Sequence, residues 1–264
     1  MLFSPVIVIY NENCADSPSC TALINLGHKP IIVDNSTMEN NNEQFCISNG
    51  LEYISMHGNK GIPKAYNCAL DHIKARNKEG YVIWLDDDTE LDSNYFTELE
   101  KAINSDKEAK IFVPVVYSLE RDNYILSPCI LNTNRVFNLK PIDTLDDIDS
   151  KEILSAINSG MAVDISVYDN YRYDENMFLD FVDHDFMNSM KGKGIKIHVL
   201  RNASLYQNYS GHERPPKAQA KVRNEIFRKD YRIYGKKAGI PKFVVEKRLM
   251  NNKLQFFFRY LFRR

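Results

Sequence analysis

Tyr81-Val82-Ile83-Trp84-Leu85-Asp86-Asp87-Asp88 is the stretch of sequence that decides the class of fold. Five consecutive apolar residues have the length of a strand buried on both faces, and three carboxylates follow at once. Buried strands of this kind are typical of a parallel sheet covered by helices on each side. Ligands of such sheets bind beyond the carboxyl ends of the strands. The stretch therefore predicts an α/β fold with a ligand site at residues 86–88.

The sequence on either side repeats the alternation of short apolar runs and helical patterns. Strands are predicted at residues 6–9, 30–33, 51–56 and 110–117, with helices ending near Leu26, beginning near Pro63 and beginning near Ser93. Asn11 and Asp34 follow two of these strands, so we expect them at the same sheet edge as the three aspartates. The second half is less regular, and there Ser159-Gly160 predicts a turn into a further strand.

The composition is typical of a globular protein. Of 264 residues, 44% are hydrophobic and 26% are charged, which excludes disordered and fibrous classes. No run reaches the roughly 18 apolar residues of a membrane span, and we expect no signal peptide at Met1. Five cysteines without a CxxC spacing indicate reduced thiols in a cytosolic protein.

The net charge of −1 conceals a basic C-terminal segment. From His212 onward there are sixteen Lys and Arg against four Asp and Glu, a net charge of +12. Within it, Leu254, Phe257, Phe258 and Leu261 fall on one helical face, widened by Phe256, Tyr260 and Phe262 beside Lys253, Arg259, Arg263 and Arg264. This pattern predicts a helix lying on an anionic membrane surface. The alternative is that the segment packs on the acidic remainder of the chain.

Three adjacent carboxylates at a strand end repel one another unless a cation lies between them. Oxygen ligands with open positions suit Mg²⁺ or Mn²⁺, which also accept substrate phosphates. The alternative for Asp86–Asp88 is a solvent-exposed turn before the helix near Ser93. Their position directly after a buried strand favours a functional role.

Several motifs occur together in a fixed order. They are Tyr10-Asn11, Val33-Asp34-Asn35-Ser36, the segment Asn59–Asn67, Trp84–Thr89, Ser159-Gly160-Met161, and Tyr173-Asp174-Glu175 leading into Phe178–Phe186. In this order and spacing they resemble the family 2 glycosyltransferases with the GT-A fold, over roughly residues 4–212. Within that family the sequence is most similar to the branch of bacterial rhamnosyltransferases and galactofuranosyltransferases. The resemblance implies a catalytic domain over residues 1–212, with a nucleotide-sugar half at about 1–118 and an acceptor half at about 119–212. A basic helical extension then covers residues 213–264.

The resemblance also implies the site residues. Asp88 and Asp86 would bind Mn²⁺ or Mg²⁺, and His212 would stand in for a third ligand that many relatives carry. The nucleotide-sugar would contact Asn11, Asp34, Asn59, Gly61, Asn67, Asp86 and Asp87. Asp34 would bind a pyrimidine base, and Gly61 would let the backbone approach the nucleotide. Taken alone, Asp34 could equally cap a turn and Gly61 serve a tight turn.

The acidic and aromatic segment Phe178–Phe186 would supply the catalytic base. The resemblance implies that Asp183 takes the proton from the acceptor hydroxyl, with Asp180 and Asp185 as rivals. His184 is interpreted as a partner of a carboxylate. The alternative is a helix with one acidic and one aromatic face.

The expected activity is that of an inverting, metal-dependent glycosyltransferase using a UDP- or dTDP-sugar of the rhamnose, galactofuranose or galactose type. The acceptor would be a glycan or a lipid-linked glycan in the synthesis of a bacterial surface polysaccharide. The protein would then act in the cytoplasm, at the inner face of the cell membrane. We expect no nucleic-acid partner, and a homodimer is one assembly that the sequence allows. One alternative is a catalytically silent sugar-nucleotide-binding partner of another transferase. A second is an aspartyl-nucleophile phosphatase, but that class usually has Thr or Val two residues past the second Asp of its motif, where this sequence has Glu90. A dehydrogenase is disfavoured because no Gly-rich turn follows the first strand.

Overall fold

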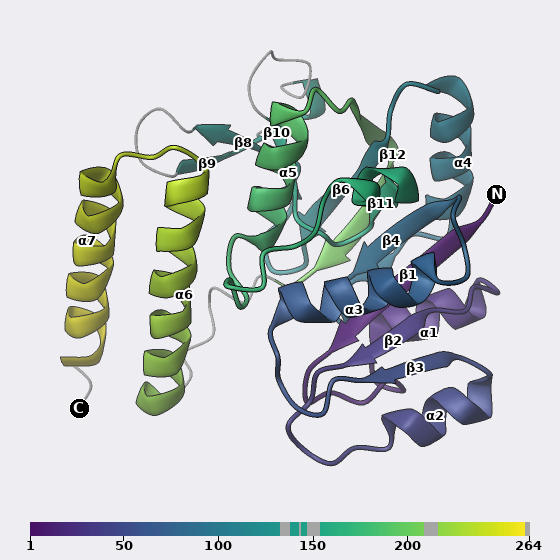
Figure 1. The fold of residues 1–264 in the computed structure, drawn as a ribbon, viewed down its shortest axis with the longest axis horizontal. Coiled ribbons are helices and arrows are strands. Elements are labelled where there is room, and N and C mark those ends of the chain that lie inside the picture. Colours follow the sequence, from purple (N-terminus) through teal and green to yellow (C-terminus); the bar gives the residue numbers. More distant parts are fainter. Residues whose placement is uncertain (133–137, 143, 147–153, 209–215, 262–264) are drawn as a thin grey trace.

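A computed structural model describes residues 1–132, 138–142, 144–146, 154–208 and 216–261 (Figure 1). The strands are β1 (Phe3–Ile9), β2 (Ile31–Asp34), β3 (Glu52–Ser55), β4 (Tyr81–Leu85), β5 (Glu90–Leu91), β6 (Ile111–Ser118), β7 (Ile125–Ser127), β8 (Cys129–Asn132), β9 (Asn138–Pro141), β10 (Leu154–Ser155), β11 (Met161–Asp164) and β12 (Ile197–Gln207). The helices are α1 (Pro18–Asn25), α2 (Asn42–Asn49), α3 (Ile62–Lys74), α4 (Tyr95–Ser105), the 3₁₀ helix η2 (Ile165–Asp169), α5 (Val182–Gly192), α6 (Lys217–Lys237) and α7 (Lys242–Leu261).

The central sheet has the order β3-β2-β1-β4-β11-β6-β12-β5, with β7 paired to β6. β1 pairs in parallel with both β2 and β4, and β2 pairs in parallel with β3, as predicted from the apolar runs. β11 then runs antiparallel between β4 and β6, so the sheet is parallel in its first half and mixed overall. A small second sheet has the order β10-β8-β9.

Two hydrophobic clusters cover the two faces of the central sheet. Alternate residues of β1 divide between them: Val6 and Val8 lie in the cluster that contains residues of α3 and α5, whereas Ile7 and Ile9 lie in the cluster that contains residues of α1 and α4. This is the period-two pattern of a strand buried on both sides. The predicted α/β class with helices on both faces is confirmed.

The C-terminal segment forms a helical hairpin at one end of the molecule, with α6 between α7 and α5 (Figure 1). On α6, Tyr231 and Tyr234 are fully buried, and their rings lie 5.3 Å from the ring of Phe181 just before α5. α7 packs on α6 through Val245 and Leu249, which are also buried. The described part of the basic segment therefore packs on the rest of the chain through α6, as the alternative interpretation proposed.

Candidate active site

The backbone of the three-aspartate loop is held by serines at the start of α1. The Ser17 hydroxyl donates to the carbonyl of Asp87 at 2.6 Å. The Ser19 hydroxyl lies 2.8 Å from the Thr89 carbonyl, and the Thr89 amide donates back to it at 3.1 Å. These contacts fix the loop beyond β4, and sequence analysis did not identify either serine.

Asp86 is the most enclosed of the three carboxylates. Its Oδ2 accepts hydrogen bonds from the Ser159 hydroxyl and from Nε2 of Gln207, the latter at 3.0 Å. Burial raises the pKa of Asp86, and the nearby charge of Asp183 raises it further, whereas the two hydrogen bonds lower it. The turn before β11 and the end of β12 therefore orient this side chain.

The pKa values of Asp87 and Asp88 are also raised, by burial and by the charges of the neighbouring carboxylates. Burial and the charge of Asp86 raise the pKa of Asp87 to about 6. Burial, followed by the charges of Asp86 and Asp87, raises the pKa of Asp88 to about 7. Such a set of oxygen donors fits a hard divalent cation, because its charge would relieve this repulsion.

The described residues contain no group of three or more His, Cys, Asp and Glu side chains arranged to hold a metal ion. The predicted third ligand, His212, lies outside the described residues. Asp86 and Asp88 thus remain the predicted ligands, and the completeness of their set stays a prediction.

Asp183 lies in the first turn of α5, where the partial positive charge of the helix N-terminus favours a carboxylate. Its Oδ1 accepts the amide of His184 at 2.7 Å and lies 3.9 Å from Nε2 of the same residue. His184 Nδ1 in turn contacts the Ser155 hydroxyl at 2.7 Å. The structure thus places His184 beside a carboxylate, as the sequence indicated.

Asp86 and Asp183 line one cavity of about 240 Å³. They are 97 positions apart in sequence and come from the ends of β4 and the start of α5. Asn158, Gln207 and Tyr66 complete its polar wall. The fold therefore brings together the two acidic clusters that the sequence singled out.

The two rivals of Asp183 are engaged elsewhere. Asp180 forms a two-point ion pair with Arg223 of α6, in which one contact is 2.7 Å. Asp185 is 2% exposed, and its Oδ2 lies 2.6 Å from Nζ of Lys237, also on α6. Of these three aspartates, Asp183 is the one that lines the cavity, which favours it as the base.

A wider cleft of about 630 Å³ adjoins the cavity and shares Ile62 and Leu179 with it. One wall comes from the strand ends and carries three of the predicted nucleotide contacts, Asn11, Asn59 and Gly61. The opposite wall is α6, which contributes Ala218, Gln219, Val222, Arg223 and Ile226. The basic extension therefore forms part of the candidate site.

Asn11 and Asp34 shape the loop at the edge of this cleft. Asn11 Oδ1 accepts the amide of Thr37 at 2.9 Å. Asp34 is 4% exposed, and its carboxylate accepts the Ser36 amide and the side chains of Asn40, Asn42 and Tyr53. Burial opposes ionisation of Asp34, but the hydrogen bonds outweigh it and lower the pKa. Asp34 does cap a turn, and it lines neither cavity; its contact with a base stays a prediction.

Gly61 is required by a close contact within the chain. It has a φ of +87°, and a Cβ on it would lie 2.8 Å from the carbonyl oxygen of Phe178. The adjacent Ile62 amide donates to that same oxygen at 2.7 Å. Close approach of the 178–180 loop therefore requires a glycine here, and the approach of a nucleotide to Gly61 stays a prediction.

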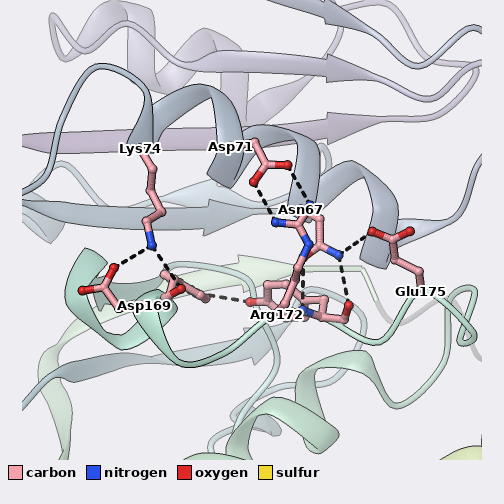
Figure 2. Close-up of polar contacts among 8 residues, drawn as sticks. Asn67, Asp71, Lys74, Asp169, Arg172 and Glu175 are labelled. Atoms are coloured by element: carbon pink, nitrogen blue, oxygen red, sulfur yellow. Dashed lines mark hydrogen bonds and ion pairs between the residues drawn. The ribbon is translucent and has the colours of Figure 1, made fainter.

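Asn67 lies away from both cavities, and Figure 2 shows its contacts. It is 1% exposed; its Nδ2 donates to the Tyr173 carbonyl at 3.0 Å and to Glu175 Oε1 at 2.9 Å, and its Oδ1 accepts the Tyr173 amide at 3.1 Å. Both ends of the amide anchor residues 173–175 on α3, and a contact of Asn67 with the nucleotide stays a prediction. The ion pair of Asp71 with Arg172 and that of Lys74 with Asp169 tie the same two segments (Figure 2).

Sequence analysis also missed Asp230 of α6, which is fully buried. Its carboxylate accepts the backbone amides of Phe178 at 3.0 Å, Leu179 at 2.8 Å and Asp180 at 2.9 Å. The 178–180 loop leads directly into Asp183. Asp230 therefore holds the loop that positions the candidate base.

We expect Asp230→Ala to lower the free energy of unfolding by about 3 kcal/mol or more, because three amides lose a charged acceptor in a buried setting. Glu246→Gln is the matched control on the same hairpin: Glu246 pairs with Arg232 at the surface, so its loss should cost under about 1 kcal/mol. Urea denaturation of both variants measures the difference. Equal values would show that Asp230 is not a structural anchor.

The sequence matches the description "Glycosyl transferase family 2" over residues 4–172, which is more than half of the chain. This chain belongs to glycosyl transferase family 2. The family resemblance inferred from the motifs is confirmed.

Other proteins resemble this family 2 chain in sequence or in fold. It is 23% identical over 202 residues to the dTDP-rhamnosyl transferase RfbF of Shigella flexneri, covering 76% of this chain and 67% of that one. The structure of S. aureus TarS 1-349 in complex with UDP aligns with a TM-score of 0.55 at 15% identity, covering 88% of this chain and 64% of that one. The mannosyltransferase PcManGT of Pyrobaculum calidifontis, in complex with GDP-Man and Mn²⁺, aligns with a TM-score of 0.57 at 12% identity, covering 87% and 62%.

These solved glycosyltransferases confirm the predicted GT-A type of fold for the family 2 chain. This chain spans 39% of the longer TarS chain, which it matches with a TM-score of 0.56 at 15% identity over 86% of its own length.

Proposed function

We propose that this chain is an inverting, metal-dependent glycosyltransferase that moves a sugar from a UDP- or dTDP-sugar to a glycan or lipid-linked acceptor. The observation that carries the proposal is the cavity lined by both Asp86 and Asp183, next to the wider cleft at the strand ends. An inverting transfer needs a cation site at the leaving diphosphate and a base at the attacking hydroxyl. Asp86 would belong to the cation site, and Asp183 would be the base.

In the proposed arrangement, the nucleotide occupies the wider cleft and the sugar extends toward Asp86. Asp88 and Asp86 would hold Mn²⁺ or Mg²⁺, with His212 as the proposed third ligand. When bound, the cation would neutralise charge that develops on the leaving diphosphate. Ser159 and Gln207 would keep Asp86 oriented through the hydrogen bonds already described.

Asp183 would accept the proton of the acceptor hydroxyl as that oxygen attacks the anomeric carbon. Its Oδ1 is held by the His184 amide, which leaves Oδ2 as the proposed proton acceptor. The loop 178–180, anchored by Asp230, keeps the side chain at the cavity. Proton removal and departure of the diphosphate then occur on opposite sides of one sugar.

A donor of the rhamnose type is favoured by the dTDP-rhamnosyl transferase among the relatives, and UDP and UDP-GlcNAc complexes among the structural neighbours support a nucleotide-sugar. The test is a panel of UDP- and dTDP-sugars with Mn²⁺ or Mg²⁺, followed by mass spectrometry of the released nucleotide. We expect metal-dependent release from at least one donor. Nucleotide binding without turnover of any donor, with or without lipid-linked acceptors, would instead support the silent partner.

The proposed place of action is the cytoplasmic face of the bacterial cell membrane, on a precursor of a surface polysaccharide. Across the helices that the structure describes, none combines the length and the apolar character of a membrane span. α7 exposes Phe243, Met250 and Leu254 on one side, with exposed fractions of 74%, 58% and 49%. Side chains 257–264, including most of the predicted apolar face, lie outside the description.

We expect the full chain to sediment with vesicles that contain anionic lipid and to release at high salt, because the exposed apolar side of α7 is flanked by basic residues. A chain ending at Asn252, and separately Phe243→Ser with Leu254→Ser, should bind at least several-fold less. Partitioning that is the same for all three proteins, or indifferent to lipid charge, would leave α7 with a packing role alone.

A further inference from the structure

The imidazole of His184 lies between the candidate base and a buried hydroxyl from a distant strand. His184 is 7% exposed and follows Asp183 directly in α5. Its Nδ1 lies 2.7 Å from the hydroxyl of Ser155, which belongs to β10 and is fully buried. Its Nε2 lies 3.9 Å from Oδ1 of Asp183. The three side chains thus form a row that runs from the small second sheet to the cavity.

Both contacts of His184 with Asp183 reach the same carboxylate oxygen. The His184 amide donates to Oδ1 at 2.7 Å, and the 3.9 Å distance from Nε2 is to that oxygen as well. The other oxygen, Oδ2, is therefore left for an acceptor hydroxyl. His184 is not one of the described residues that line the cavity. It can act on the reaction only through the carboxylate that it contacts.

The Ser155 hydroxyl determines which nitrogen of His184 carries the proton. In a neutral imidazole one nitrogen is a donor and the other an acceptor, so the partner of one fixes the role of the other. With the proton on Nδ1, the lone pair of Nε2 would face a carboxylate, which is repulsive. With Ser155 donating to Nδ1, Nε2 carries the proton and is attracted to Oδ1 of Asp183. The row therefore favours the form protonated on Nε2.

Repulsion between two carboxylates makes such a contact useful. The charge of Asp183 is close enough to Asp86 to raise the pKa of that buried group. Like charges on one cavity favour side-chain conformations that separate them. The side chain of Asp183 is 20% exposed, so it has room to turn away from Asp86. A second N–H group on Oδ1 opposes that rotation and keeps Oδ2 at the cavity.

We propose that His184 is a positioning residue for the base Asp183, and that Ser155 fixes the imidazole in the form protonated on Nε2. This inference rests on the proposed function. The 3.9 Å separation would shorten to a hydrogen bond when substrate fills the cavity, as contacts in active sites commonly do. The small second sheet thereby acquires a part in the reaction through β10.

The first test compares two amide substitutions that each keep one contact of the imidazole. The side-chain nitrogen of glutamine reaches the place of Nε2, so His184→Gln keeps a donor for Asp183. That of asparagine reaches only the place of Nδ1, so His184→Asn keeps the contact with Ser155 alone. Release of dTDP from dTDP-rhamnose with Mn²⁺, with water as the acceptor, measures kcat and KM. His184→Asn should lower kcat about tenfold, the effect of losing one hydrogen bond to a charged group, and His184→Gln less than about threefold.

KM and the affinity for dTDP should change by less than about twofold in both variants, because neither contact reaches the nucleotide. His198 is the matched control: its Nδ1 lies 3.1 Å from Asp106, and it lines neither cavity. The same two substitutions there should leave kcat unchanged. Equal losses in His184→Asn and His184→Gln, or a slower His184→Gln, would overturn the positioning role. A parent chain that releases nucleotide from no UDP- or dTDP-sugar would instead overturn the proposed function.

The second test uses the unmodified chain without any nucleotide, so it depends neither on turnover nor on a variant folding. Nitrogen-15 NMR of the imidazole rings at pH 8 reports which nitrogen carries the proton. The His184 signal is the one altered in His184→Gln or in Ser155→Ala. We expect the form protonated on Nε2, and a mixture of both forms in Ser155→Ala. A neutral ring protonated on Nδ1 would overturn the proposal, and a ring protonated on both nitrogens would overturn the part of Ser155.

Discussion

Asp183→Asn is expected to lower the rate of sugar transfer by about 10²- to 10⁴-fold while leaving nucleotide binding unchanged. The amide keeps the shape of the side chain and its place in the first turn of α5, but it cannot accept the proton of an acceptor hydroxyl. Steady-state transfer and dTDP affinity, measured on the same preparation, separate the two effects. A fall in both together would indicate a binding role instead.

Asp180→Asn is the control for this prediction, because Asp180 lies three positions earlier and lines neither the cavity nor the cleft, although its partner Arg223 is in the wall of the cleft. It should retain most of the transfer activity. If Asp180→Asn is the inactive variant and Asp183→Asn transfers sugar normally, the assignment of the base is wrong. Asp185→Asn is a poorer control, since it would leave Lys237 beside a neutral group in a buried position.

Asp88→Ala is expected to reduce metal-dependent donor turnover by about 10²- to 10³-fold, the usual scale for losing electrostatic stabilisation of a leaving group. Asp122→Ala, at an exposed loop aspartate, is the control and should be unchanged. Asp86→Ala should lose stability as well as activity, because Ser159 and Gln207 would lose their shared acceptor. Unchanged turnover by Asp88→Ala at limiting Mn²⁺ would contradict the assignment.

The pH dependence of stability gives this prediction a readout that does not need activity. In the folded chain the pKa of Asp87 is about 6 and that of Asp88 about 7, above the ordinary value of 3.8. The folded state therefore binds more protons than the unfolded state between about pH 4 and 7, and stability falls as the pH rises through that window. Mn²⁺ should raise the melting temperature more at pH 7.5 than at pH 5. Asp88→Asn should reduce both the pH dependence of stability and the pH dependence of the Mn²⁺ effect. An unaltered profile would show that the pKa of Asp88 is not raised in the folded chain.

The parts of the fold that follow local patterns were predicted well. The run Tyr81–Leu85 forms β4, and the helix expected near Pro63 is α3, with Pro63 in its first turn. α2 was missed because Asn42–Asn49 is polar and has no clear apolar face. Antiparallel β11 was also beyond prediction, since the direction in which a strand pairs depends on where the chain returns to the sheet.

The site divides in the same way. Asp86, Asp87, Asp88 and Asp183 stand out because acids directly after an apolar run, or among aromatic residues, are visible as sequence neighbours. Asp230 and Asn158 are not, since their meaning arises only from partners far along the chain: Asp230 contacts amides about 50 positions earlier, and Asn158 contacts Tyr66 92 positions away. The anchoring contacts of Asn67 were not predicted for the same reason, because its partners at 173–175 lie more than 100 positions away.

By itself the sequence determined that this protein is an α/β chain with a parallel β1–β4 core and carboxylates at one sheet edge, because apolar period and strand-end position are local properties. The tertiary structure alone decided which acid faces the cavity, that α6 forms a wall of the cleft, and that Gly61 serves the 178–180 loop. These outcomes depend on packing and on buried hydrogen bonds between distant segments. A buried carboxylate or amide takes whichever partner the fold brings within about 3 Å, and no local pattern encodes that choice.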